Sequence, residues 1–308
     1  MTQSRIDTHH HVVPPFYRDW LLAKGMDAGG LPMPTWTEAE ARQLMDMQNV
    51  RTAILSVSTP GVHLGDDTEA REMARRVNEF AADLVRREPQ RFGFFATLTL
   101  PDVEGAITEA AYALDHLGAD GVVLLANVQG MYLGCAEWMP LLEALNTRAA
   151  RVFVHPSSLP CEPVPGIPPF AADFLLDTTR AALNLAKSGA LEQYPELKII
   201  LSHAGGFVPF AAERMARICS EDGSIEKGIA RLRRLYFDTA LSSSRYALPS
   251  LLAFADPSHI TYGSDWPYAN TKRSCHFSEL LDAYDLEPSQ RSAIEHGNAQ
   301  ALFPRLAN

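Results

Sequence analysis

The sequence has few cysteines and no long hydrophobic run. Without a Cys-x-x-Cys pair, neither a disulfide framework nor a cysteine-based zinc motif is indicated, and we expect reduced thiols in a cytoplasmic protein. The polar first residues predict no signal peptide, and every apolar run is far shorter than the roughly 20 residues that span a bilayer. The four cysteines are widely spaced: Cys135, Cys161, Cys219 and Cys275.

Positive charge is also in short supply. Lys and Arg number 27 against 37 Asp and Glu, which gives a net charge of −10 and a pI of about 5.5. This balance argues against nucleic acid or an anionic membrane as a partner. It does not exclude a small anionic substrate, because a local metal ion or arginine outweighs distant, screened charge.

Short apolar segments alternate with amphipathic stretches along the whole chain. The strand candidates begin with the residues around Ile6 and continue at 52–58, 92–98, 121–126, 151–155, 198–203, 235–239 and 259–265. The helix candidates include 68–87, 103–117, 140–150, 173–188 and 209–220. Near-continuous apolar strands of this kind favour a parallel sheet covered on both faces. Eight of them predict an α/β protein with a closed (β/α)8 TIM barrel, rather than an open sheet, in one domain over residues 1–308.

Two segments are predicted as insertions after strands. Residues 16–37 are rich in glycine and proline towards their end and predict a long loop after the first strand. Residues 156–169 hold six prolines and predict a rigid loop after the fifth strand. Both follow strand ends, on the face where barrel enzymes place their sites.

Three consecutive histidines end the first predicted strand. Because side chains alternate along a strand, His9 and His11 are expected on one face and His10 on the other. Two imidazoles side by side are suitable ligands for zinc or a similar divalent ion. A purification-tag remnant is the alternative, but Ile6-Asp7 in front and an apolar run behind argue against it.

Three other predicted strands end in a metal-ligand type: His155, His203 and Asp265. Singly, each has an ordinary structural explanation, such as a strand end, a glycine-rich turn or a helix cap. Together with the paired histidines of the first strand, they predict one metal centre at the mouth of the barrel.

This order of residues resembles the amidohydrolase superfamily. The motif sequences are similar to those of the branch that contains the aminocarboxymuconate semialdehyde, γ-resorcylate and 6-methylsalicylate decarboxylases. Segments 36–61 and 174–195 most resemble 6-methylsalicylate decarboxylase. The motifs are Ile6-Asp7-Thr8-His9-His10-His11, Val154-His155-Pro156, Ser202-His203-Ala204-Gly205-Gly206, Tyr262-Gly263-Ser264-Asp265-Trp266-Pro267 and Gly297-Asn298-Ala299.

The resemblance implies one divalent metal ion, held by His9, His11, His155 and Asp265, with His203 beside it. Two-metal relatives carry a lysine on strand four, which the segment 121–127 lacks. Zinc is the expected metal, because this set of histidines and an aspartate suits it. Manganese, which some relatives use, is the alternative, since ligand type alone does not separate the two.

The resemblance also suggests how substrate is bound. Arg214 matches an arginine that reaches the neighbouring subunit's site, which implies a homodimer or larger homo-oligomer. Phe16, Trp20 and Trp266, with Tyr17 and Trp36, are candidates to wall an aromatic ring. The second substrate arginine of the semialdehyde decarboxylase has no clear counterpart here.

The implied reaction is decarboxylation of a small 2-hydroxybenzoate-like acid. Asp265 would carry the proton to the ring carbon, and His203 would stabilise that proton or exchange it with the hydroxyl. The main alternative is a hydrolase in which a metal-bound water opens a lactone or an amide, with Asp265 as the base. A barrel that binds metal without catalysis is the third reading.

Overall fold

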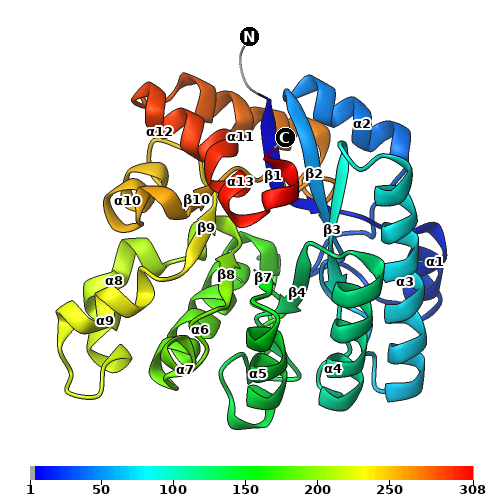
Figure 1. Ribbon diagram of the computed structural model, residues 1–308, viewed down its shortest axis with the longest axis horizontal. Helices are drawn as coiled ribbons and strands as arrows, with labels where there is room; N and C mark the ends of the chain where they lie inside the picture. The colour runs from blue at the N-terminus through cyan, green and yellow to red at the C-terminus, as the bar shows by residue number, and fades with distance from the viewer. Residues whose placement is uncertain (1–3, 308) are drawn as a thin grey trace.

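A computed structural model describes residues 4–307, in which eight parallel strands form the inner layer (Figure 1). Their order is β1 (Arg5–His11), β2 (Val50–Ser56), β3 (Phe92–Thr97), β4 (Gly121–Leu125), β7 (Arg151–His155), β8 (Lys198–Leu201), β9 (Tyr236–Asp238) and β10 (Ile260–Thr261). Bridges from Asp7 to Tyr262 and from His10 to Trp266 join the last strand to the first. The predicted (β/α)8 barrel is therefore confirmed.

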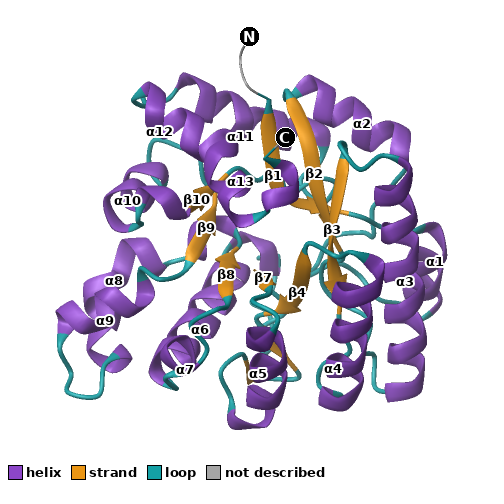
Figure 2. Cartoon of the chain, viewed as in Figure 1, coloured by secondary structure: helices purple, strands orange, loops and turns teal. Residues whose placement is uncertain are grey.

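Helices surround the strands (Figure 2). They are α1 (Pro15–Ala23), α2 (Glu38–Met47), α3 (Asp67–Arg87), α4 (Val103–Tyr112), α5 (Met139–Thr147), α6 (Asp173–Lys187), α7 (Ala190–Gln193), α8 (Val208–Ala216), α9 (Ile225–Leu232), α10 (Leu248–Phe254), α11 (Thr271–Ala283), α12 (Pro288–Ser292) and α13 (Asn298–Leu302). A small hairpin, β5 (Asn127–Val128) and β6 (Met131–Tyr132), follows β4. The longest helix, α3, is capped by Asp66, whose side chain accepts from the Glu69 N–H, and ends with Arg86 and Arg87, as the helix dipole favours.

The segment after β1 differs from its prediction. Residues 15–23 form α1 with Pro15 in its first turn, where the missing N–H costs no hydrogen bond. Only residues 24–37 lack regular structure. The segment after β7 has no helix or strand from 156 to 168.

The barrel interior is a packed apolar core. It is closed at the N-terminal end of the strands by the C-terminal segment, in which Ala299, Leu302, Phe303 and Leu306 are buried. The polar strand ends therefore lie at the opposite, open end. The strand residues of this core are Ile6, Ile54, Phe95, Val123, Phe153 and Ile200.

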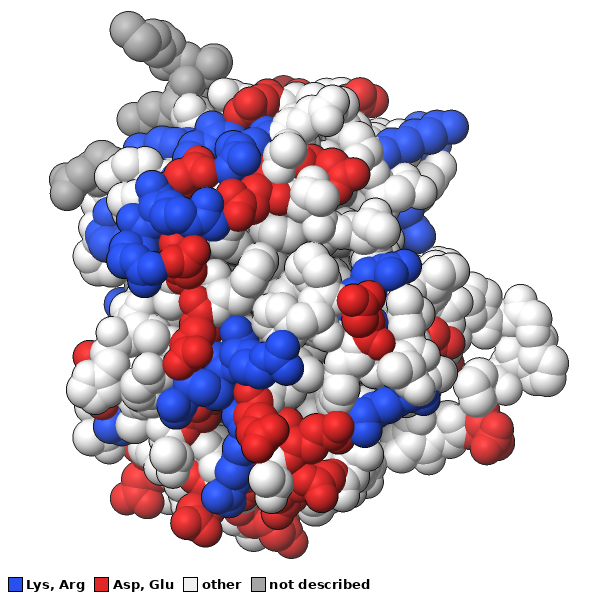
Figure 3. All heavy atoms as spheres, turned by 90° about the vertical axis from the view of Figure 1, so that its right-hand side faces the viewer, with Lys and Arg blue, Asp and Glu red and all other residues white. Residues whose placement is uncertain are grey.

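Acidic and basic side chains interleave on the face that carries α1 to α3 (Figure 3). Arg71 pairs with Asp102 at 2.6 Å, and Arg87 pairs with Glu38 at 2.7 Å. This face offers no continuous basic surface for a polyanion. Among residues 4–307, no helix has the length and apolarity needed to cross a bilayer.

Candidate active site

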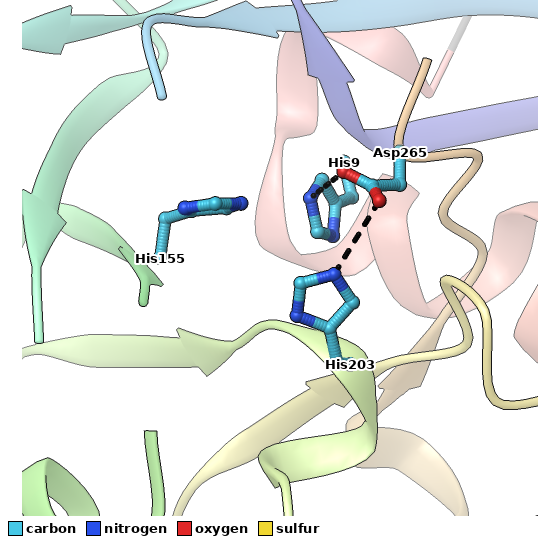
Figure 4. Close-up of side chains that lie close together, drawn as sticks. All are labelled: His9, His155, His203 and Asp265. Atoms are coloured by element: carbon cyan, nitrogen blue, oxygen red, sulfur yellow. Dashed lines mark ion pairs between the residues drawn. The ribbon is translucent and has the colours of Figure 1, made fainter. Parts of the chain in front are cut away.

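Side chains at or just beyond the C-terminal ends of four strands meet at the open end of the barrel (Figure 4). One ligand atom from each of His9, His155, His203 and Asp265 lies within 4.8 Å of the others, and all four residues are buried. The predicted convergence of distant segments is thus present in the structure. The chain positions explain it, because the carboxyl ends of parallel barrel strands share one rim.

His11 belongs to the same cluster. Its Nε2 lies 3.0 Å from Nε2 of His9 and 3.2 Å from Oδ1 of Asp265. His10 lies outside this cluster, where its ring packs against Trp266 with centroids 5.1 Å apart. The expected separation of His10 from His9 and His11 is therefore observed.

Unusual backbone geometry positions two of these side chains. His203 and Asp265 have φ values of 51° and 58°, in the left-handed region that non-glycine residues rarely occupy. Such conformations persist where surrounding structure imposes them, and they concentrate at functional sites. At Gly263 a Cβ would lie 2.8 Å from the Cβ of His9, so only glycine lets the end of β10 approach β1 this closely.

An outer set of acceptors orients three histidines. Nδ1 of His9 lies 2.6 Å from Oδ2 of Asp238, and Nδ1 of His155 lies 2.9 Å from the carbonyl oxygen of Pro156. Nδ1 of His11 lies 3.2 Å from the carbonyl oxygen of Ser56. Since carboxylates and carbonyls only accept, each Nδ1 carries a proton and each Nε2 presents a lone pair to the cluster.

The resulting arrangement requires a cation. The Nε2 lone pairs of His9 and His11 face each other at 3.0 Å, with Oδ1 of Asp265 only 3.1 and 3.2 Å away. Acceptors at these distances repel unless a proton or a metal ion lies between them. Three imidazoles and a carboxylate suit zinc and also manganese, so the residues fit one divalent ion.

In the protein without metal, a proton fills this role. Burial alone would lower the pKa of His9, but the carboxylates of Asp238 and Asp265 outweigh it and raise this pKa to about 10. Burial lowers the pKa of His11 to about 4, and the positive charge on His9 acts in the same direction. One imidazole of the pair is therefore charged and the other neutral.

The two oxygens of Asp265 face different groups. Oδ1 lies near His9 and His11, whereas Oδ2 lies 3.5 Å from Nε2 of His203. Burial would raise the pKa of Asp265, but hydrogen bonds from His11, His203 and His9 hold it well below its usual range. Nδ1 of His203 is buried without a partner among the described residues.

A cavity of about 440 Å³ opens from this cluster. His155, His203 and Asp265 form part of its wall, and most of the remaining wall is apolar. Such a lining suits a small aromatic ligand fixed by a few polar groups. The aromatic side chains that line it are Phe170, Phe174, Phe207, Phe210, Tyr246 and Tyr268.

The aromatic residues that line the cavity differ from those predicted. Phe16, Trp20 and Trp266 do not line the cavity, because α1 turns the first two towards α3. Phe16 packs on the ring of Phe80 with centroids 6.0 Å apart, and the indole N–H of Trp20 donates to a carboxylate on α3 at 2.9 Å. Trp266 is buried against His10. Tyr17 and Trp36, in the same segment, are buried in the outer core.

Arg214 is exposed on α8 and does not line the cavity of its own chain. Phe210, one helical turn earlier, lines the cavity mouth and is 81% exposed. A role for Arg214 in the site thus requires a second subunit.

Two residues of the site were not predicted from the sequence. Asp238 orients His9 and also accepts the backbone N–H of His203 at 2.9 Å. The feature of the sequence that could have identified Asp238 is its position as an acidic residue at the end of an apolar strand. Tyr268 lines the cavity three residues after Asp265, and its hydroxyl is buried without a partner among the described residues.

Comparison with known proteins gives consistent results. The amidohydrolase family model matches residues 6–305. A 6-methylsalicylic acid decarboxylase from Penicillium expansum is 38% identical over 318 residues, covering 98% of this chain and 97% of that protein. A gamma-resorcylate decarboxylase from Polaromonas sp. is 28% identical over 90% of this chain and 93% of that protein.

Solved structures agree with the fold. A crystal structure described as amidohydrolase II superposes with a TM-score of 0.93 at 31% identity, covering 98% of this chain and all of that one. A dihydroxybenzoic acid decarboxylase from Polaromonas sp., with bound manganese and the inhibitor 2-nitroresorcinol, superposes with a TM-score of 0.83 at 24% identity, covering 98% and 97%.

Proposed function

The chain belongs to the amidohydrolase family, and we propose that it is a metal-dependent decarboxylase of a small aromatic, 2-hydroxybenzoate-like acid. The relative that shares 38% of its residues over nearly the full length of both chains is a decarboxylase of this type. The observation that carries the proposal is the cation-requiring cluster of His9, His11 and Asp265 at the inner end of a largely apolar cavity.

We assign one divalent metal ion to His9, His11, His155 and Asp265. When bound, this ion would hold the carboxylate and the ortho-hydroxyl of the substrate and withdraw electron density from them. The segment 121–127, which carries β4, contains no lysine to bridge a second ion. The ligand types suit both zinc, the metal we expect, and manganese, and the manganese bound in the Polaromonas structure supports manganese as the alternative.

The residues of this chain then handle the proton. The ring carbon takes up one proton before or as its bond to the carboxylate breaks, the electron pair of that bond returns to the ring, and CO2 leaves. Oδ2 of Asp265 is the oxygen for this transfer, since Oδ1 faces the histidine pair. Because its low pKa leaves Asp265 ionised, it first takes up a proton, from His203 or from the substrate hydroxyl, and then passes this proton to the ring carbon. His203, 3.5 Å from Oδ2, supplies the next proton or receives one from the hydroxyl.

The apolar walls contribute to the same reaction. Phe174 and Leu175 border the cavity close in sequence to Asp177, which anchors the loop after His155. Excluding water strengthens the electrostatic contacts inside and favours release of an uncharged product, CO2. The relatives described above are decarboxylases, which favours this reaction over hydrolysis of a lactone or an amide.

We also propose that a second copy of the chain supplies Arg214. Its guanidinium is exposed and lies one turn beyond Phe210 at the cavity mouth, so a neighbouring subunit packed there would cover both. A planar guanidinium makes paired, charge-assisted bonds to a carboxylate. A cytoplasmic location stays a prediction from the four free cysteines.

The test is direct. The purified protein is loaded separately with zinc and with manganese, and substituted salicylates and dihydroxybenzoates are screened for CO2 release. We expect turnover with at least one acid and metal binding close to one ion per chain. Turnover of lactones or amides with no CO2 from any hydroxybenzoate would refute the proposal.

A further inference from the structure

Arg273 lies at the cavity wall as its only lysine or arginine among the described residues. It occupies the first turn of α11, the helix that follows the loop carrying Asp265. Its guanidinium carbon lies 5.4 Å from the centre of the Phe170 ring, and its side chain is exposed. The arginine therefore borders both the cavity and the solvent.

The guanidinium has no acidic partner among residues 4–307. Other arginines of this chain are matched closely: Arg71 binds both oxygens of Asp102 at 2.6 and 2.8 Å, and Arg305 binds those of Asp120. Stacking on an aromatic face restricts a guanidinium but leaves its N–H groups at the edge free to donate. Arg273 thus presents unused donors at the mouth.

Its place in the helix is unfavourable without a ligand. The first turn of α11 contains Lys272 and Arg273 and no acidic residue. By contrast, α2 and α3 have Glu40 and Glu69 at the corresponding third position, where a carboxylate complements the helix dipole. Two cations at the positive end of a helix oppose that dipole. A residue that opposes the local preference of its helix in this way is often found at a functional site.

The segment that carries the Phe170 ring is closely packed. Phe170 lies in a short helical turn next to Pro169, and a Cβ at Gly30 would lie 2.9 Å from the Cδ of Pro169. The segment after β1 therefore packs closely against the segment that carries the Phe170 ring. This support keeps the stacked guanidinium at the mouth.

From these observations we infer that Arg273 is the capture site for the carboxylate of an incoming aromatic acid. The inference rests on the proposed function. In a protein with a net charge of −10, an anion is repelled at long range and needs a local cation at the entrance. Arg273 binds the anion first, and the buried, unpartnered hydroxyl of Tyr268 offers the next donor on the way inward.

The test measures binding, so it does not depend on turnover. Stopped-flow fluorescence on the metal-loaded protein measures the association of 2-hydroxybenzenesulfonate, an anion with no CO2 to lose, and of the neutral analogue salicylamide. Arg273→Gln should lower the association rate constant of the anion about tenfold, as expected for loss of electrostatic capture at the mouth, and should leave that of salicylamide unchanged. Arg273→Lys should fall between the two.

Lys272→Gln is the matched control. It removes the same charge from the same helical turn, but Lys272 does not line the cavity. We expect less than a twofold change in the association rate constant of the anion. Raising salt from about 0.02 M to about 0.2 M should slow anion association in the wild type and have much less effect in Arg273→Gln.

Three results would overturn the inference. They are an unchanged association rate constant of the anion in Arg273→Gln, an equal slowing for salicylamide, or an equal slowing in Lys272→Gln. Absence of CO2 release by the wild type from every acid is a separate result that refutes the proposed function alone.

Discussion

Asp238 determines which nitrogen of His9 is available to a metal ion. Its Oδ2 accepts from Nδ1 of His9 at 2.6 Å, while its Oδ1 accepts the backbone N–H groups of His203 and Ala240, both at 2.9 Å. In Asp238→Asn the two backbone donors still require an oxygen. The amide NH2 must therefore face His9, whose Nδ1 then accepts and whose proton moves to Nε2.

A protonated Nε2 cannot bind a metal ion. Loss of an outer partner typically lowers metal affinity 10- to 100-fold, and this change of tautomer places the expected loss at the upper end, about 100-fold or about 2.7 kcal/mol. Competition with a chromophoric chelator measures the affinity for zinc and for manganese. The pKa of His9 should also fall from about 10, since Asp238 is the main group that raises it.

Asp177→Asn provides the control for loss of a buried carboxylate. Asp177 is as fully buried as Asp238, but its oxygens accept from Asn127 and from the backbone N–H of Ser157 and contact no histidine of the cluster. Its metal affinity should stay within about twofold of the wild type. An affinity in Asp238→Asn equal to that of the wild type would refute the tautomer argument, and an equal loss in both variants would attribute it to general destabilisation.

Four further predictions concern protons. Asp265→Asn should retain part of the metal and lose CO2 release at least about 1000-fold, measured by gas evolution with metal analysis, and a wild-type rate would contradict its role. Because the pKa of His9 is about 10 without metal, loading the apoprotein at pH 8 should release about one proton, seen as a dependence of the calorimetric heat on the buffer; heat independent of the buffer would exclude it. The same raised pKa stabilises the apoprotein fully below about pH 6.5, and this stabilisation is lost as pH rises through about 10. Burial raises the pKa of Asp177 to about 6, so the native state holds an extra proton between about pH 4 and 6 and stability falls over that range as pH rises. Asp177→Asn should remove up to about 3 kcal/mol of this fall in denaturant titrations, and an unchanged pH slope would contradict the assignment.

The strands and the polar residues at their ends could be predicted because their signals are local. A buried parallel strand is a short, nearly continuous apolar run, and its last residue is set by where that run stops. In a barrel these last residues share one rim, so His155, His203 and Asp265 could be placed together without coordinates.

The start of the segment after β1 was predicted wrongly for an equally local reason. Its glycines begin at Gly25, so residues 15–23 contain no breaker after Pro15, and a proline in the first turn favours a helix. The helix that forms turns Phe16 and Trp20 away from the cavity. The high glycine and proline content of residues 16–37 as a whole concealed the boundary between the helix and the loop that follows it.

The sequence by itself determined the barrel, the open end that carries the chemistry and the residue types gathered there, because periodicity and strand ends are properties of neighbouring residues. Only the tertiary structure decided the cavity wall, the pairing of Asp238 with His9 and the position of Arg273 over Phe170. These contacts join residues about 100 to 230 positions apart, whose approach depends on loop paths and packing that no short stretch of sequence encodes.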